Sequence, residues 1–263
     1  MTASAWTLGL ALWAVFALLV RWIERASVRE GDLFCGLLIR VMQLSAGWMH
    51  RLSVEGIGNI PRDRAAGEGL VIVANHTAFI DPLLVQAVVP FEVRWIMGED
   101  MASPAHKPFW DYAGVILVDR RVNESAPLRA AIKHLKSGGV IGVFPEGFIE
   151  RPPRVVFPFK EGVGLIISRS GSRVLPVVIE GTPQVEPGSQ ALWTPSRSRL
   201  RILPPIDYTT RKLGPAEIAH DLRRVFLDAT GWPARNVTPR WEDGAWTDIG
   251  LDGREIRRPA SGT

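Results

Sequence analysis

The sequence predicts an α/β protein whose mixed, largely buried sheet is flanked by helices and preceded by two apolar N-terminal helices. The chain has 263 residues and is 46% hydrophobic, which suffices for one large domain with a substantial core plus an appendage. Short apolar runs alternate with segments of helical periodicity from residue 70 to residue 230. No residue between Thr2 and Val20 is charged.

The first apolar segment predicts a membrane anchor. Trp6 to Val20 is almost wholly apolar, and about 20 such residues suffice for a helix to span a bilayer. Arg21 and Arg25 follow the apolar run, whereas a secretory signal peptide carries its basic residues before it. By the positive-inside rule, we expect an uncleaved anchor in the inner membrane, with the rest of the chain on the cytoplasmic side. A helix buried in the core is the alternative.

Residues 33–51 predict a second helix. Their apolar positions recur at helical spacing and are interrupted by Arg40, Gln43, His50 and Arg51. We therefore expect residues 1–52 to form a membrane-associated helical hairpin that enters, or lies on, an anionic phospholipid membrane. A plain hairpin packed on the domain is the alternative.

Residues 53–231 predict the α/β domain, and the remainder, 232–263, an irregular C-terminal tail. Apolar runs predict strands at residues 70–74, 93–97, 115–118, 140–144, 174–179 and 200–203. Helical patterns occupy residues 82–89, 126–137, 162–169 and 215–230. From Trp232 onward the chain is polar and rich in proline, glycine, arginine and tryptophan, which is typical of irregular structure.

Composition excludes several classes of function. A formal charge of +4 and a pI near 9.6 suit an anionic partner such as a phospholipid surface. The single cysteine, Cys35, excludes an internal disulfide, and five scattered histidines without H-E-x-x-H spacing give no reason to expect a metal. No G-x-S-x-G or G-x-x-x-x-G-K-[ST] motif occurs, which argues against a serine hydrolase and a P-loop enzyme. Nucleic-acid binding is not expected, because it would rest on charge alone.

His76 and Asp81 are candidate catalytic residues. Asn75 and His76 directly follow the predicted strand 70–74, and active sites of open α/β sheets gather at such strand ends. In one continuous helix the His76 and Asp81 side chains would point about 140° apart, so they meet only if the chain turns between them. An aspartate that accepts from one imidazole nitrogen leaves the other free to take a proton. Alternatively, Asp81 is a helix N-cap before Pro82, and His76 is an ordinary strand-end residue.

Three further blocks occur at predicted strand ends. They are G-V-I-L-V-D-R at 114–120, V-F-P-E-G at 143–147 and L-P-V-V-I at 175–179. Together with N-H-T-A-F-I-D at 75–81, in this order and spacing, they resemble the glycerolipid acyltransferase family, which includes 1-acylglycerol-3-phosphate acyltransferase. The resemblance extends from Leu70 to Ile179, and F-K-E-G at 159–162 also matches the family.

The resemblance implies an acyl transfer between two substrates. His76 would be the general base that removes the proton from the acceptor hydroxyl, and Asp81 would orient it. The hydroxyl would attack the thioester of acyl-CoA or acyl-carrier protein, with no metal, bound cofactor or covalent intermediate. Arg120 would hold the phosphate of the lysophospholipid acceptor, 1-acylglycerol-3-phosphate, and the product would be phosphatidic acid. The other residues implied in acceptor binding are Asn75, Phe144, Pro145, Glu146, Gly147 and Lys160.

Two departures from the family pattern concern the acceptor. F-P-E-G is commonly followed by T-R-S, whereas F-I-E at 148–150 removes a hydroxyl and a cation and adds a carboxylate. Arg151 and Arg154 are the candidates to compensate. G-E-D-M at 98–101 also lacks the lysine usual there. Two alternatives therefore stand: acylation of a lysolipid without a phosphomonoester, such as a lyso-aminolipid, and a non-catalytic lipid-binding protein on the same scaffold.

Overall fold

A computed structural model describes residues 3–65, 67–102, 104–119, 125–242, 245–250 and 254–256. The α-helices are α1 (Ala3–Glu24), α2 (Leu33–Trp48), α3 (Asp81–Val88), α4 (Lys107–Tyr112), α5 (Ser125–Lys136), α6 (Glu161–Ser170) and α7 (Pro215–Thr230). The strands are β1 (Ser53–Glu55), β2 (Leu70–Ala74), β3 (Arg94–Gly98), β4 (Ile116–Val118), β5 (Val140–Val143), β6 (Arg173–Glu180), β7 (Arg199–Ile202), β8 (Val237–Glu242), β9 (Ala245–Gly250) and β10 (Glu255–Ile256).

Seven strands within the described residues form one mixed sheet, in the order β1-β7-β6-β2-β5-β3-β4. The five strands from β6 to β4 run parallel, and β7 and β1 run in the opposite direction. The carboxyl ends of β2, β5 and β6, at Ala74, Val143 and Glu180, therefore lie at the same edge as the first residues of β1 and β7, Ser53 and Arg199. We call this edge the carboxyl edge. The predicted mixed, buried sheet flanked by helices is confirmed.

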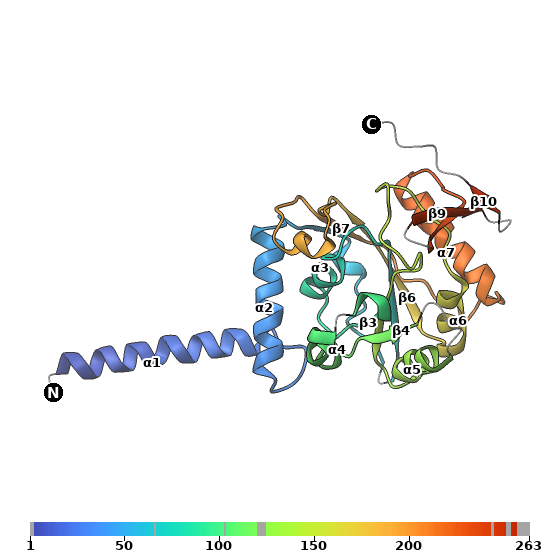
Figure 1. Cartoon of the computed structure of the whole chain (residues 1–263). Coiled ribbons are helices and arrows are strands. Elements are labelled where there is room, and N and C mark those ends of the chain that lie inside the picture. The colour runs from blue at the N-terminus through green and yellow to red at the C-terminus, as the bar shows by residue number, and fades with distance from the viewer. Residues whose placement is uncertain are drawn as a thin grey trace.

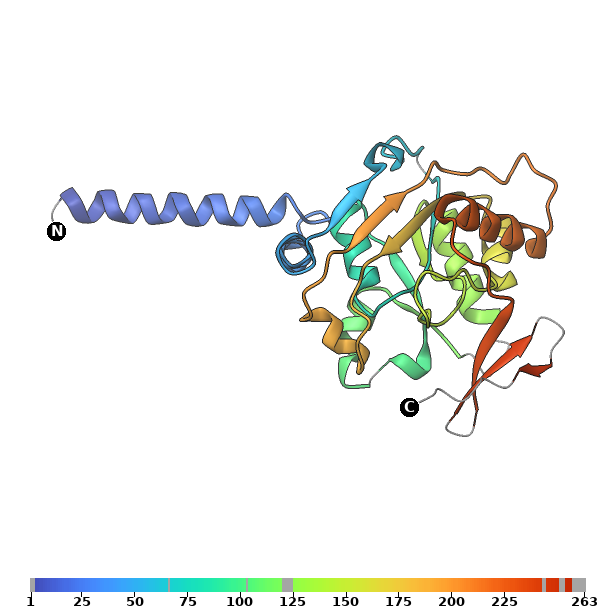
Figure 2. The ribbon, with the colours of Figure 1, turned by 90° about the horizontal axis from the view of Figure 1, so that it is seen from above.

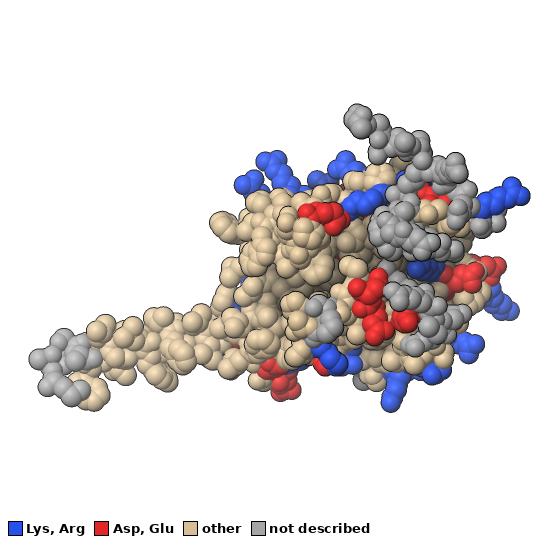
Figure 3. Space-filling model, viewed as in Figure 1, with Lys and Arg blue, Asp and Glu red and all other residues tan. Residues whose placement is uncertain are grey.

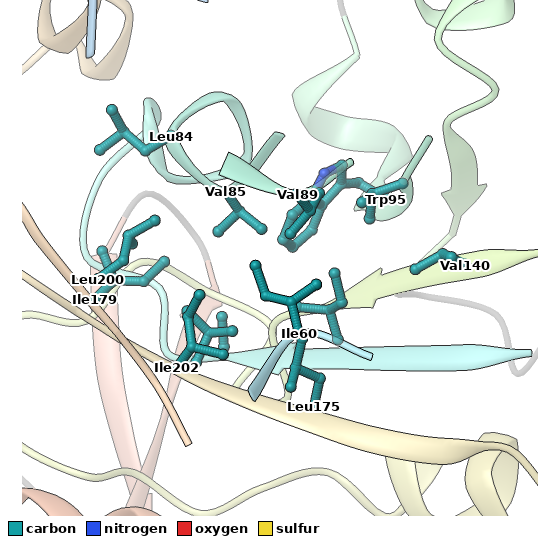
Figure 4. Close-up of a cluster of buried hydrophobic side chains, with 14 of the residues drawn as sticks. Ile60, Leu84, Val85, Val89, Trp95, Val140, Leu175, Ile179, Leu200 and Ile202 are labelled. Atoms are coloured by element: carbon teal, nitrogen blue, oxygen red, sulfur yellow. The ribbon is translucent and has the colours of Figure 1, made fainter. Parts of the chain in front are cut away.

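Alternate residues of β2 point to two separate cores, as the two-residue period of a strand requires. Leu70, Ile72 and Ala74 face the side covered by α2 and α3, where Figure 4 shows the packed apolar cluster around Trp95 and Leu175. Val71 and Val73 face the side covered by α5, α6 and α7. All five β2 residues are buried, because the sheet lies between two layers of helices (Figure 1).

Helix α1 projects away from this domain (Figures 1 and 2). Residues Trp6–Glu24 have a mean hydropathy of 1.8, and none of them is buried. By length and composition, this helix can cross a bilayer. A soluble domain rarely exposes so large a continuous apolar surface to water.

Helices α1 and α2 of the expected helical hairpin are joined by a short turn but do not lie alongside each other (Figures 1 and 2). Helix α2 buries Cys35, Ile39 and Ala46 and packs against α3, whereas α1 contacts α2 only near the turn that joins them (Figures 1 and 2). Arg40 fixes this junction by donating to the carbonyl oxygen of Trp22 at 2.8 and 3.0 Å. One face of α2 packs on the domain, and its other face stays exposed instead of being covered by α1.

The predicted irregular tail from Trp232 is wrong over residues 237–242, 245–250 and 255–256. Strands β8, β9 and β10 form a small antiparallel sheet. Thr238 and Trp246 are strand-forming residues at its paired positions, but Pro239 and the glycines obscure the strand pattern in the sequence. The division into three domains stays a prediction.

Replacing Gly164 by alanine is expected to lower the free energy of unfolding by about 1–3 kcal/mol, since overpacking a tight contact displaces the backbone. A Cβ at Gly164 in α6 would lie 1.9 Å from the carbonyl oxygen of Pro215, which opens α7. Chemical denaturation of the detergent-solubilised protein measures this loss. Gly162→Ala is the matched control in the same helix, because a Cβ there meets nothing within 4 Å. That variant should be as stable as the parent or more so, and an equal loss in both would refute the packing explanation.

Candidate active site

His76 and Asp81 are in contact at the carboxyl edge. The chain leaves β2 at Ala74 and turns before α3 begins, so that His76 Nδ1 lies 3.0 Å from Asp81 Oδ2. The same carboxylate oxygen accepts the backbone N–H of Thr77 at 2.6 Å and of Ala78 at 2.8 Å. Asp81 is fully buried, and His76 retains 18% of its side-chain exposure. The expected contact between the pair, at roughly 2.6–3.2 Å, is therefore present.

Asp81 is not the N-cap of α3. It is the first residue of the helix, and Ile80 holds the N-cap position without a side-chain cap. The Asp81 side chain instead folds back onto the loop that carries His76. Its hydrogen bonds to two backbone N–H groups hold this loop in place, while its contact with Nδ1 leaves Nε2 with no hydrogen bond among the described residues.

The imidazole ring of His76 is also held by aromatic stacking. Its plane lies 12° from that of Phe144, with the ring centroids 3.9 Å apart. Phe144 in turn stacks on Trp95, at 4.7 Å and 15°. Phe144 follows β5 and Trp95 lies in β3. Aromatic residues from these two parallel strands therefore hold the His76 ring, which follows a third parallel strand, β2. The predicted site residue Phe144 thus contacts the His76 ring directly, on the α2–α3 side of the sheet.

The loop from Asn75 to Thr77 is fastened to β6 and its following segment. The buried Asn75 side chain donates to the carbonyl oxygen of Ile179 at 3.0 Å and accepts the Ile179 N–H at 2.8 Å. Thr77 shares a hydroxyl hydrogen bond with Thr182. Asn75 therefore joins two strands, and its predicted contact with substrate stays a prediction.

Arg151 and Gln184 hold the same loop from the other side. Both donate to the carbonyl oxygen of Thr77, at 3.0 and 2.7 Å, and they are hydrogen-bonded to each other. One of the two candidate cations after F-P-E-G therefore lies beside His76, although its guanidinium is engaged by the backbone. Sequence reasoning missed Gln184 and Trp95, because neither lies in a block that marks the family.

Glu146 and Glu150 form a buried carboxyl pair behind the His76 loop. Both residues are fully buried, and their carboxyl groups interact with each other, with the Asn75 side chain next to that of Glu150. Burial raises the pKa of Glu146, and the negative charge of Asp81 adds to this effect. Burial raises the pKa of Glu150 further, together with the charges of Glu146 and Asp81. The Glu150 backbone N–H donates to the carbonyl oxygen of His76 at 2.6 Å.

The remaining predicted residues lie around the turn after β5. Gly147 has a φ of +78°, which favours glycine, and a Cβ there would lie 2.6 Å from Lys160 Nζ. The Lys160 N–H donates to the carbonyl oxygen of Pro145 at 2.9 Å. Lys160 is exposed and adjacent to Gly147, whereas Glu146 points into the interior. Arg120 lies outside the described residues.

These features define an α/β protein with a hydrogen-bonded histidine–aspartate pair at the carboxyl ends of its parallel strands. The family model for Acyltransferase matches residues 51–180, which include this pair. The structure of the Thermotoga maritima 1-acyl-sn-glycerophosphate (LPA) acyltransferase, PlsC, is 27% identical, with a TM-score of 0.60. That match covers 76% of this chain and 81% of the other.

Two curated relatives are named 1-acyl-sn-glycerol-3-phosphate acyltransferase. The one from Borreliella burgdorferi is 32% identical over 140 residues, and covers 50% of this chain and 52% of its own. The one from Helicobacter pylori is 27% identical over 115 residues, and covers 41% and 47%. The chain thus spans about half the length of both relatives. With the structural match, these similarities show that residues 51–180 form a domain of the acyltransferase family and resemble the glycerolipid acyltransferases.

Proposed function

We propose that this chain transfers a fatty acyl group from acyl-CoA or acyl-carrier protein to the free hydroxyl of 1-acylglycerol-3-phosphate, giving phosphatidic acid. The observation that carries the proposal is the His76 ring, held at Nδ1 by the buried Asp81 and open at Nε2. Binding a lipid needs no such base. The names of the relatives support this choice of acceptor.

In the proposed reaction, His76 Nε2 removes the proton from the acceptor hydroxyl as its oxygen attacks the thioester carbonyl. The carbon–sulfur bond breaks when the tetrahedral intermediate collapses, and the imidazolium returns its proton to the leaving thiolate. Asp81 stabilises the imidazolium and fixes its tautomer. Because the ring is stacked on Phe144, little rotational freedom remains to be lost when the acceptor binds. No metal or bound cofactor enters this scheme.

The choice of acceptor depends on the residues around Gly147. Arg120 is proposed to hold the phosphate, and Lys160 is the exposed cation beside Gly147. Glu150, which stands where the family commonly has the serine of T-R-S, is buried rather than directed at an acceptor, and Ile149 stands in place of the arginine. The loss of that cation keeps a phosphate-free lysolipid as the second candidate acceptor.

The proposed location is the cytoplasmic face of the inner membrane. Helix α1 can cross a bilayer, and Arg21 in its last turn and Arg25 just after it lie at its end nearer the domain. A membrane-bound enzyme meets its lysolipid acceptor in the bilayer, while acyl-CoA and acyl-carrier protein reach it from the cytoplasm.

Detergent-solubilised protein is expected to form phosphatidic acid from 1-acylglycerol-3-phosphate when offered a panel of lysolipids with each donor. Mass spectrometry of the products identifies both acceptor and donor. Turnover of a lyso-aminolipid alone would overturn the proposed acceptor. Lysolipid binding without turnover on any member would instead support the non-catalytic alternative.

Arg120→Ala is expected to raise the KM for 1-acylglycerol-3-phosphate about 10–100-fold, since a charge-assisted phosphate contact contributes about 1.5–3 kcal/mol. The KM for a phosphate-free lysolipid should change little. Steady-state kinetics on both acceptors measure the difference. Equal effects on the two would remove Arg120 from the phosphate site.

A further inference from the structure

Three arginines gather at the carboxyl edge, outside the site described above. Arg51, Arg197 and Arg199 line a shallow pocket of about 390 Å³ together with Ser53 and Ser198. All three arginines are exposed. Figure 3 shows basic side chains gathered above the end of α2 and around β7. We call these three residues the arginine cluster.

Backbone hydrogen bonds build the cluster from two distant segments. The N–H groups of Ser196 and Ser198 donate to the carbonyl oxygens of Met49 and His50, at 3.1 and 2.9 Å. The Ser53 N–H donates to the carbonyl oxygen of Ser198 at 3.0 Å. The chain before β7 therefore runs directly beside the chain that leaves α2, and the cluster has a fixed backbone.

The cluster and His76 share one edge of the sheet. Ser53 pairs with Arg199, and Arg199 pairs with Glu180 at the end of β6, the neighbour of β2. Adjacent strands lie about 4.8 Å apart, which places the cluster roughly 10–15 Å from the end of β2 along that edge. A surface that binds the cluster therefore also faces the edge at which His76 lies.

An apolar surface leads to the same place. Leu37, Val41, Leu44 and Trp48 recur at helical spacing along the outer face of α2, and their exposure rises from 45% to 81% toward the cluster. Trp193, on the adjoining segment, is 77% exposed. Exposed tryptophans next to arginines are typical of the boundary between membrane headgroups and lipid chains.

The charge of the cluster fits an anionic surface. Among the described residues, Glu55 is its acidic partner, 3.6 Å from Arg199, and no ion pair engages Arg51 or Arg197. Arg51 also has a φ of +41°, a left-handed conformation that favours glycine. The left-handed backbone at residue 51 disfavours an arginine, so the conformation of the chain does not explain why an arginine is present there.

We propose that Arg51, Arg197 and Arg199 bind the phosphate groups of anionic phospholipids and so hold the carboxyl edge of the sheet against the membrane. The exposed face of α2 and the two tryptophans favour a bilayer surface over a soluble phosphate compound. The inference rests on the proposed membrane location, and its test measures docking without acyl transfer. It can therefore fail while the proposed reaction stands.

The test uses the full chain in bilayer discs of phosphatidylcholine, with and without phosphatidylglycerol. Cys35 is buried, so in a Trp193→Cys variant the new cysteine takes an environment-sensitive maleimide fluorophore selectively. Phosphatidylglycerol is expected to shift the label emission to the blue and to shield it from an aqueous quencher. Since each surface arginine strengthens attraction to anionic lipid by about fivefold, Arg51→Gly with Arg197→Gln and Arg199→Gln should abolish this shift.

The matched control carries Lys133→Gln, Lys136→Gln and Arg169→Gln. These exposed residues on α5 and α6 give the same change in charge on the opposite side of the sheet. The control should keep the shift. Arg51→Gly should unfold at the same temperature as the parent or higher, because glycine relieves the left-handed backbone. A label that ignores phosphatidylglycerol, or responds equally in both triple variants, would overturn the proposal. So would a label that ignores this lipid but responds to coenzyme A without bilayers.

Discussion

His76→Ala is expected to lower kcat at least about 10³-fold and to leave the protein folded. General-base catalysis is commonly worth 10²–10⁴-fold, and the described residues place no second base against Asp81. The side chain is partly exposed, so its loss leaves no large void in the core. Initial rates at saturating lysolipid measure the fall in kcat, and thermal unfolding of the same sample tests the fold.

Two further variants test whether the fall in kcat is specific to the proposed role of His76 as a base. Asp81→Asn should lower kcat to a similar extent with a smaller change in KM, because an amide cannot stabilise the imidazolium as a carboxylate does. His220→Ala changes an exposed histidine on α7, on the opposite side of the sheet, and should leave the rate unchanged. Retained turnover in His76→Ala would remove His76 as the base.

The main elements of the domain and the contact between His76 and Asp81 were predictable from local patterns. Leu70–Ala74 is a continuous apolar run, and helix 215–230 begins at a proline and ends before Gly231, so its predicted bounds match α7. The spacing of His76 and Asp81 allowed contact only if the chain turned. The structure supplies that turn, and Asp81 fastens it through two backbone N–H groups.

Other parts of the site depend on contacts between distant residues and leave no local signal. Trp95 reads as one apolar residue of a strand, yet it completes the stack beneath His76. Gln184 lies in a loop without a recognisable motif, and its hydrogen bond to Thr77 depends on the path taken after β6. Residues 33–51 predicted a helix, but the face that packs on α3 was not visible in the pattern alone. Glu150 was visible only as a departure from the family.

Glu150→Gln is expected to raise the free energy of unfolding at pH 8 and to make stability less dependent on pH. The pKa of Glu150 is raised above its ordinary value of 4.5, chiefly by burial and then by the charges of Glu146 and Asp81. The folded protein therefore keeps a proton that the unfolded chain releases above pH 4.5. Stability is highest below that pH and falls as the pH rises toward the folded-state pKa.

The size of this effect follows from the linkage between protonation and folding. One retained proton costs about 1.4 kcal/mol for each pH unit above the unfolded pKa, or roughly 3 kcal/mol at neutral pH. Glutamine has the shape of a protonated glutamate and pays no such cost. Its amide can also donate to Glu146, as the protonated carboxyl group of Glu150 does in the parent chain. The negative charge in the site would then stay on Asp81, next to His76.

Denaturant unfolding of the parent and the Glu150→Gln variant at pH 5, 7 and 8 measures the difference. The gap in unfolding free energy should be small at pH 5 and should widen with pH in favour of the variant. Glu150→Ala provides the contrast, because it removes the same carboxyl group but leaves a cavity, and it should be less stable than the glutamine variant at every pH. A constant gap between parent and glutamine variant would mean that Glu150 is ionised in the folded protein. In that case a neighbouring residue would have to supply the positive charge that is missing after F-P-E-G. Arg151 is a candidate, because its guanidinium donates to the carbonyl oxygens of Thr77 and Glu150 and so lies close to the Glu150 residue.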